Sequence, residues 1–399
     1  MTNDLSRTAG QRATALVLLW LSGACLRLTV LAVPPVVPLL HADLHLSETG
    51  IGWLSSLPPM LFAIAAVPGA LLIARFGLVP ALVVGLLLNA IGSAARAAIP
   101  DAAFLYVSTT VMAAGVSIMQ PSLPPLVRAW FPRRIGFATA VYTTGLLIGE
   151  ILAAALTIPL ILPMVGDSWR LNFVVWSVPV LATALLVAVC APQLGGTGNA
   201  APFAGRRWWP DWKRPLIWRL GLILGSVNAT YFVANAFLPD YMIADGRPDL
   251  VSAALTALNV GQLPAAFLML GFAGRLVKRP WAYVTTGAAS LVGLIGMMTM
   301  QGEWIVFWAG ILGFTGAVTL ILALALPSVL GAPDDVHRTS AGMFTISYSL
   351  AMVLSVVGGW LWDLTHAPIA GFAPVALCAL LIIALASTVR HADHPSIGA

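Results

Sequence analysis

Apolar runs of twenty or more residues recur along almost the whole of this 399-residue chain. A helix needs about 20 apolar residues to cross the hydrocarbon core of a bilayer, so the pattern predicts many membrane spans. Charged residues make up only 9% of the sequence, whereas about 25% is typical of a soluble domain. Porin-type barrels are excluded because their strands alternate in segments of about ten residues. The expected fold class is therefore an all-α polytopic membrane protein.

Polar, Pro-rich and Gly-rich breaks divide the runs into twelve expected transmembrane helices. We place them at residues 13–40, 50–74, 79–99, 102–128, 136–164, 171–191, 216–243, 250–274, 282–300, 304–330, 340–364 and 368–389. Residues 1–191 then form an N-terminal six-helix bundle, and 216–399 form a C-terminal six-helix bundle. The polar stretch 192–215 is expected to be a cytoplasmic linker, with Trp208, Trp209 and Trp212 at the membrane interface.

The basic residues predict the orientation. An even number of spans puts both termini on one side, and most Lys and Arg fall on that side, whereas three fall opposite, namely Arg96, Arg170 and Arg247. The positive-inside rule therefore places the termini and the linker in the cytoplasm. The net charge of +5 reflects this topology rather than a nucleic-acid partner, and the lipid bilayer is the expected surrounding.

Arg27 lies near the middle of the first apolar run. An arginine at the centre of a bilayer helix costs about 2.5–3.5 kcal/mol on insertion scales, so such residues usually face a cavity or a partner and serve a function. We expect Arg27 to bind the substrate. The alternative is a structural charge that pairs with an acid or with backbone carbonyls.

Glu150 is the expected counterpart of Arg27. Each lies about fourteen residues into its span, and both spans run outward, so the two charges should have similar depth. Two roles stay open, because a paired Glu150 would remain ionised whereas a desolvated one would carry a proton. Gly145 and Gly149 in the same span are expected to permit close helix contacts.

Polar residues at helical spacing mark further candidates. Gln120 follows Ser117 by three residues, and Asn228, Tyr231 and Asn235 have i, i+3, i+7 spacing. With Tyr348, near Thr345 and Ser349, they complete the expected substrate-binding set. The alternative for each is an ordinary interhelical hydrogen bond that contributes about 0.6 kcal/mol.

Catalytic and cofactor motifs are absent from the sequence. It has no GxxxxGK[ST], GxSxG or HExxH motif, so we expect neither an enzyme nor an ATP-driven pump. The six histidines fall at span ends or tails, and Cys25, Cys190 and Cys378 lack metal-ligand spacing. No metal site and no cofactor are expected.

Several segments resemble the major facilitator superfamily, and within it the bacterial cyanate and nitroimidazole transporter branch. They are Leu26-Arg27, 38–47 (PLLHADLHLS), 74–77 (ARFG), 123–136 (LPPLVRAWFPRRIG) and 360–365 (WLWDLT). The resemblance implies two parallel six-helix repeats and a location in the cell inner membrane. It also implies secondary transport of a small solute by alternating access at a site near the bilayer midplane.

The sequence departs from that branch at three places. Ala70, Ala74 and Val79 replace signature residues after the second span, and Arg27 is retained without the asparagine and proline that usually flank it. Glu150 stands where the branch has a neutral residue.

We therefore expect a monomeric transporter of a small anionic or polar organic solute, with possible proton coupling at Glu150. A multidrug-type exporter and a non-transporting membrane sensor or scaffold are the alternatives.

Overall fold

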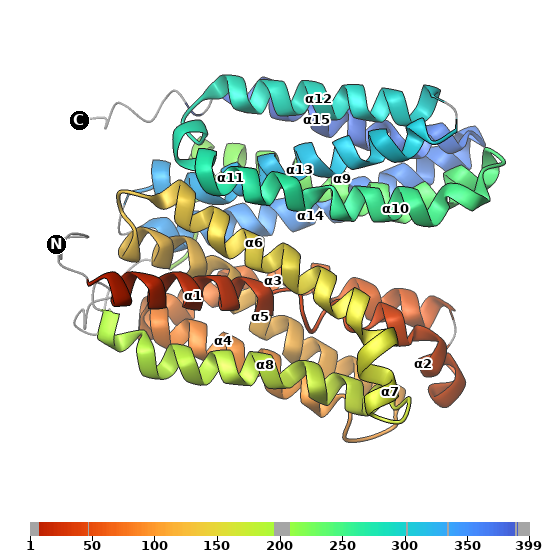
Figure 1. The fold of residues 1–399 in the computed structure, drawn as a ribbon. Coiled ribbons are helices and arrows are strands. Elements are labelled where there is room, and N and C mark those ends of the chain that lie inside the picture. The colour runs from red at the N-terminus through yellow and green to blue at the C-terminus, as the bar shows by residue number, and fades with distance from the viewer. Residues whose placement is uncertain are drawn as a thin grey trace. The chain divides into compact units, whose positions relative to one another are not determined.

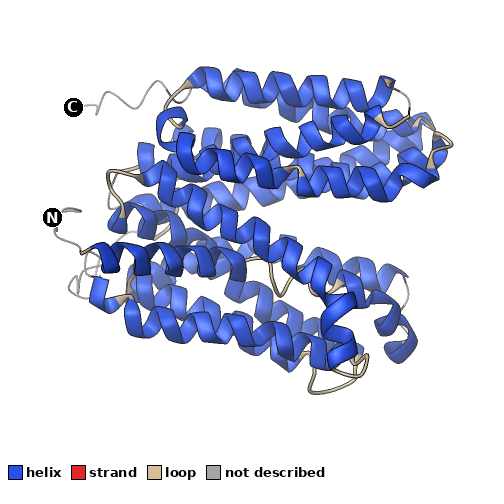
Figure 2. Cartoon of the chain, viewed as in Figure 1, coloured by secondary structure: helices blue, strands red, loops and turns tan. Residues whose placement is uncertain are grey.

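The computed structural model describes residues 8–46, 48–194, 208–300, 302–332, 335–387 and 389. Within these ranges every regular element is a helix (Figures 1 and 2). The chain divides into two compact units. The first ends at Pro210 and also takes in residues 333–341, and the second comprises Asp211–Ala332 and the residues from Gly342 onward. The predicted linker lies mostly outside the described residues, as do both expected cytoplasmic termini.

The first unit contains eight α-helices and a π-helical turn among its described residues. They are α1 (Ala9–Cys25), α2 (Val37–Leu44), α3 (Glu48–Phe76), α4 (Leu78–Ala95), α5 (Ala102–Trp130), α6 (Ile135–Leu156), the π turn η3 (Thr157–Ile161), α7 (Leu162–Met164) and α8 (Trp169–Cys190). A short 3₁₀ helix, η2 (Pro34–Val36), precedes α2.

The described residues of the second unit contain seven further α-helices. They are α9 (Pro215–Ala244), α10 (Val251–Val260), α11 (Gln262–Leu276), α12 (Pro280–Thr299), α13 (Trp304–Leu330), α14 (Val336–Thr365) and α15 (Ala373–Leu385). Residues 336–341 at the start of α14 are assigned to the first unit. Gly261 separates α10 from α11, where a Cβ atom would lie 2.6 Å from the carbonyl oxygen of Gly310.

Eleven helices in the described part of the chain are long and apolar enough to cross a bilayer. Each coincides with one of the expected spans, so the prediction of a multi-pass helical membrane protein is confirmed. The first expected span, 13–40, is not among the eleven because its helix is interrupted after Cys25. The expectation that residues 13–40 form one continuous helix was therefore wrong.

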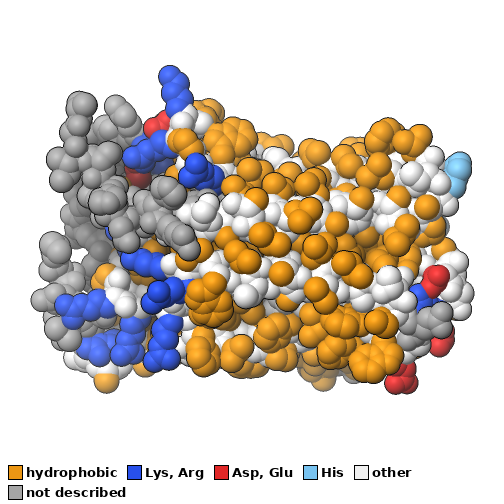
Figure 3. All heavy atoms as spheres, turned by 90° about the horizontal axis from the view of Figure 1, so that it is seen from above, with side chains coloured by type: hydrophobic (Ala, Val, Ile, Leu, Met, Phe, Trp, Pro, Cys, Tyr) orange, Lys and Arg blue, Asp and Glu red, His pale blue; other side chains and the backbone are white. Residues whose placement is uncertain are grey.

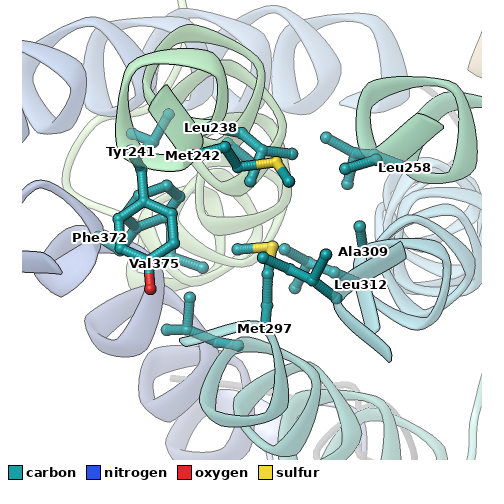
Figure 4. Close-up of a cluster of buried hydrophobic side chains, with 14 residues drawn as sticks. Leu238, Tyr241, Met242, Leu258, Met297, Ala309, Leu312, Phe372 and Val375 are labelled. Atoms are coloured by element: carbon teal, nitrogen blue, oxygen red, sulfur yellow. The ribbon is translucent and has the colours of Figure 1, made fainter. Parts of the chain in front are cut away.

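A cluster of apolar side chains fills the interior of the second unit (Figure 4). Leu238 and Met242 from α9 meet Met297 from α12 and Leu312 from α13, and all four are at least 95% buried. Tyr241 packs edge to face against Phe372, with ring centroids 5.5 Å apart. This packing joins α9, α12 and α13 with the 3₁₀ turn Pro368–Phe372 that precedes α15.

The outer surface of the second unit is also apolar. Figure 3 shows hydrophobic side chains along the middle of one face, most Lys and Arg at one end, a histidine at the other, and acidic side chains at both ends. Trp281, Val292 and Ile295 of α12 are each more than half exposed. An exposed apolar band between charged ends is the surface that a bilayer covers.

Candidate functional site

The first span is broken at the position of Arg27. Helix α1 ends at Cys25, residues 26–33 form turns, and η2 and α2 follow. Pro34 and Pro35 keep the helix from resuming through residues 30–35, because they have no N–H to donate to the carbonyls of Val30 and Leu31. Arg27 therefore lies in non-helical backbone, and its side chain is half-buried.

Polar side chains from α4 and α8 bond the carbonyl groups that the break releases. The Asn89 side-chain nitrogen donates to the Cys25 carbonyl at 2.8 Å, and its oxygen accepts from the Thr29 hydroxyl at 2.7 Å. Asn172 of α8 donates to the Ala32 carbonyl at 3.4 Å. Irregular backbone at membrane depth needs such partners, since lipid offers none.

Arg96 makes a third contact of this kind. Its Nη2 donates to the Thr29 carbonyl at 3.1 Å and to the Ser93 hydroxyl at 2.7 Å, and its guanidinium carbon lies 4.0 Å from the centroid of the Phe173 ring. The side chain is fully buried. Arg96 falls near the end of the expected span 79–99, and the structure places it at the C-terminal cap of α4.

Glycines bring α1 and α6 into backbone contact (Figure 1). A Cβ atom on Gly149 would lie 2.8 Å from the Cα of Ala24, and one on Gly145 would lie 2.9 Å from the Trp20 carbonyl carbon. Gly145 contacts Trp20 and Gly149 contacts Ala24. The residue numbers increase together in both helices, so α1 and α6 run parallel. Glu150, which is 7% exposed, directly follows Gly149. The segment that carries Glu150 and the segment that leads to Arg27 are thus neighbours.

The same helix carries a buried polar face. The hydroxyl groups of Thr139 and Thr143 are buried and have no hydrogen-bond partner in the described part of the chain. Thr157, where the π turn begins, accepts a hydrogen bond from the Trp176 indole at 3.0 Å. Such turns often mark functional positions in helices. Gln120 on α5 is also buried, and its side-chain oxygen has no partner among the described residues.

The candidates in the second unit are engaged by their neighbours. Asn228 donates to the Ser347 hydroxyl of α14 at 2.8 Å. Asn235 donates to the Tyr231 carbonyl at 2.8 Å and accepts from Asn259 of α10 at 2.9 Å. These bonds favour the interhelical interpretation of Asn228 and Asn235.

Tyr348, the remaining candidate of this unit, is 4% exposed. Its ring stacks on that of Phe344 with centroids 6.4 Å apart. Substrate contact by Tyr231 and Tyr348 stays a prediction.

An outer hollow of about 440 Å³ lies where α2 meets the start of α8. The Trp169 indole donates to Asp43 at 2.9 Å, and Arg170 lies 3.6 Å from the same carboxylate. Both charged side chains are more than a third exposed, so the ion pair adds little stability. The hydrogen bond from Trp169 to Asp43 is the contact that links α2 to the start of α8.

Sequence reasoning missed the polar residues that hold the broken segment. Asn89, Ser93 and Arg96 have i, i+4, i+7 spacing and so share one helix face. That spacing was visible in the sequence. Their partner was not, because only the fold places the 26–33 turn against α4.

Comparison with known sequences identifies a family and several relatives. The sequence model of the Major Facilitator Superfamily matches residues 19–325. YycB, an uncharacterized transporter of Bacillus subtilis (strain 168), is 27% identical, and the match covers 86% of this chain and 84% of YycB. The 2-nitroimidazole transporter of Escherichia coli (strain K12) is 25% identical over 92% and 91% of the two chains. The cyanate transport protein CynX of the same strain is 27% identical over 93% and 96%.

A solved structure has the same fold. The proton:xylose symporter XylE, with bound 6-bromo-6-deoxy-D-glucose, superposes with a TM-score of 0.75 at 13% sequence identity and covers 97% of each chain. At this identity the match establishes the fold alone. The sequence relatives confirm the resemblance to the cyanate and nitroimidazole transporter branch.

Proposed function

The chain belongs to the Major Facilitator Superfamily and is a secondary transporter, and on that premise we propose that its substrate is a small anion bound by Arg27. The position of Arg27 carries the proposal. Arg27 lies where the helix of the first span is interrupted. Its guanidinium and the backbone carbonyls of the interruption are polar groups within an otherwise apolar segment. Intramembrane charges of this kind are functional by default.

The chemistry of arginine suits an anionic ligand. A guanidinium presents several donors in a planar fork, stays charged at every physiological pH, and matches carboxylate-like oxygen pairs. Gln120, with a buried side-chain oxygen that lacks a partner among the described residues, would contact a polar atom of the ligand from α5. Both side chains belong to the first unit.

We propose that Glu150 responds to the state of Arg27 during the transport cycle. The contact between Gly149 and Ala24 brings the two segments together, so the occupancy of Arg27 would alter the electrostatic field at Glu150. Substrate and protons drive alternation only if they bind the two transport states with different affinity. Protonation of Glu150 in one state would supply such a difference.

A small polar organic solute is the second candidate. It is favoured by the similarity to the 2-nitroimidazole transporter, which is named for a heterocyclic organic solute. The similarity to the cyanate transport protein favours an anion. A multidrug-type exporter has no comparable support from the relatives named above.

We also propose that the basic end of the helices is cytoplasmic and that the protein lies in a cell inner membrane with two six-helix bundles. In the first unit, Arg12 lies near the start of α1, and Arg75 and Arg128 lie in the last turns of α3 and α5. In the second unit, Arg275 ends α11 and Arg279 caps α12. The burial of Arg96 removes one positive charge from the opposite loops, which strengthens the asymmetry.

Uptake by proteoliposomes tests the proposal. Labelled cyanate serves as the probe anion, with formate and nitrite as competitors and 2-nitroimidazole as the polar probe. Loss of a charge-assisted hydrogen bond costs about 1.5–3 kcal/mol, so Arg27→Gln should raise the KM for the anion about 10- to 100-fold. Arg27→Lys should retain part of the affinity.

Arg170→Gln is the matched control, because it removes an equal charge from an exposed pair. Its uptake should equal that of the wild type. Anion uptake by Arg27→Gln at the wild-type KM would refute the role of Arg27. Uptake of 2-nitroimidazole without uptake of any anion would select the second candidate.

A further inference from the structure

We infer that Arg96 is a positioning residue that fixes the conformation of the broken segment and thereby sets the placement of the Arg27 side chain. The inference rests on the proposed function of Arg27. Its structural basis is the hydrogen bond from Arg96 Nη2 to the carbonyl oxygen of Thr29, two residues beyond Arg27.

The turn that contains Arg27 is closed by its own backbone. The Arg27 carbonyl accepts from the N–H of Val30 at 3.1 Å and from that of Leu31 at 2.9 Å. Thr29 lies inside this turn, so a group that holds the Thr29 carbonyl also fixes the direction in which residue 27 leaves the backbone. Asn89 contacts the chain on both sides of Arg27, since it donates to the Cys25 carbonyl and accepts from the Thr29 hydroxyl.

Burial of the Arg96 guanidinium costs more free energy than one hydrogen bond to a carbonyl returns. Among the described residues no carboxylate lies within ion-pair distance of Arg96, whose contacts are carbonyls, a hydroxyl and the Phe173 ring. Its Nη1 is buried and has no partner in the described part of the chain. Burying a charge without an acid, and leaving a donor unsatisfied, opposes stability. The arrangement therefore needs a benefit other than stability.

The location of Arg96 supplies that benefit. Arg96 caps α4, so its charge meets the partial negative charge at the C-terminal end of that helix. The released carbonyl of Thr29 adds a further acceptor. The guanidinium thus couples the end of α4, the ring of Phe173 on α8 and the broken segment. A shorter neutral side chain would lack both the charge and the reach.

The far side of the break is anchored to α8 as well. Asn172 bonds the Ala32 carbonyl, and Asp43 of α2 bonds Trp169. With contacts at Cys25, Thr29, Ala32 and Asp43, the break is held from both sides by α4 and α8. It is a fixed loop that presents Arg27, rather than a hinge between α1 and α2.

Two measurements on purified protein in lipid nanodiscs test the inference without requiring a substrate. Hydrogen exchange by mass spectrometry reports the amides of residues 26–33, and site-resolved phenylglyoxal labelling reports the reactivity of the Arg27 guanidinium. Loss of the Thr29 contact in Arg96→Gln should raise the exchange of these amides about tenfold. It should also change the labelling rate of Arg27 several-fold.

Arg96→Lys keeps the charge and one donor but loses the planar stacking, so it should restore part of the wild-type behaviour. Ser93→Ala removes the hydroxyl that accepts from the guanidinium at 2.7 Å and donates to the Phe173 carbonyl at 3.3 Å, and it leaves the bond from Arg96 to Thr29 in place. It provides a folded variant if Arg96→Gln does not accumulate, and should shift both readouts in the same direction by a smaller factor. Arg170→Gln is the control and should leave both unchanged.

The outcomes separate this inference from the proposed function. Unchanged exchange in both Arg96→Gln and Ser93→Ala overturns the anchoring role. Faster exchange with an unchanged Arg27 labelling rate overturns the positioning role. Where cyanate is transported, Arg96→Gln should raise the KM about tenfold and leave Vmax within about twofold, and a loss of Vmax alone contradicts the inference. A wild-type protein that transports no anion defeats the proposed function, and the two substrate-free readouts still decide the role of Arg96.

Discussion

Substitution of Gly149 by alanine tests the close contact between α1 and α6. The new Cβ would lie 2.8 Å from the Cα of Ala24 and 2.9 Å from its carbonyl carbon, where ordinary contacts begin at 3.4 Å. The carbonyl oxygen of Ala24 would lie closer still, so the two backbones must separate by more than about 0.6 Å at this point. All of the clashing atoms belong to the backbone, so no side-chain rotation relieves the overlap.

The expected loss of stability follows from two opposing terms. Overpacking of this kind costs about 1–3 kcal/mol, whereas alanine in a helix interior is favoured over glycine by about 1 kcal/mol. Because rigid backbone is involved, we take the upper part of the first range, which gives a net destabilisation of about 1–2 kcal/mol. For a unit of about 200 residues this lowers the Tm by about 2–8 °C.

Thermal unfolding of the purified protein, followed by intrinsic tryptophan fluorescence in detergent, measures this effect. The control is Gly271→Ala on α11, where an added Cβ meets nothing within 4 Å. Helix propensity alone acts there, so its Tm should equal or exceed that of the wild type. If Gly149→Ala also unfolds at or above the wild-type Tm, the close approach of α1 and α6 is incorrect.

Two further predictions concern single polar groups. Replacement of Glu150 by glutamine should abolish any difference in uptake rate between pH 5 and pH 8, because an amide does not bind the coupling proton. A Glu150→Gln variant that keeps the wild-type pH response in proteoliposomes would rule out this residue as the coupling group. A double-mutant cycle of Asn235→Ala and Asn259→Ala should give a coupling energy of about 0.6 kcal/mol in thermal unfolding. Additive effects would show that the 2.9 Å contact contributes nothing.

Hydropathy predicted most of the membrane-spanning helices because the thickness of a bilayer sets their length. It failed at the first span for a related reason. Pro34 and Pro35 are apolar residues, so an average over the window hides the two backbone donors that they remove. The sequence flagged Arg27 by its charge, but not the turn in which it lies.

The candidate site was predicted less completely than the fold. Gly149 was expected to make a close contact, yet its partner, Ala24, lies 125 positions earlier and is known only from the fold. Asn228 and Asn235 were selected by helical spacing, which does not distinguish a ligand contact from the bonds to Ser347 and Asn259. Arg96 was not recognised as a contact of the first span, because its partners outside α4, the Thr29 carbonyl and the Phe173 ring, are known only from the fold.

The interruption at Cys25 bears on how the protein is made. Helix α1 has 17 residues, so it spans about 25 Å, less than the hydrocarbon thickness of about 30 Å. The released carbonyls beyond it gain their side-chain partners only when α4 and then Asn172 of α8 have been synthesised. At about 5–20 residues per second, this takes on the order of ten seconds. Throughout that interval the nascent first span carries Arg27 and unbonded backbone, so its stable insertion must await the later helices of its own unit.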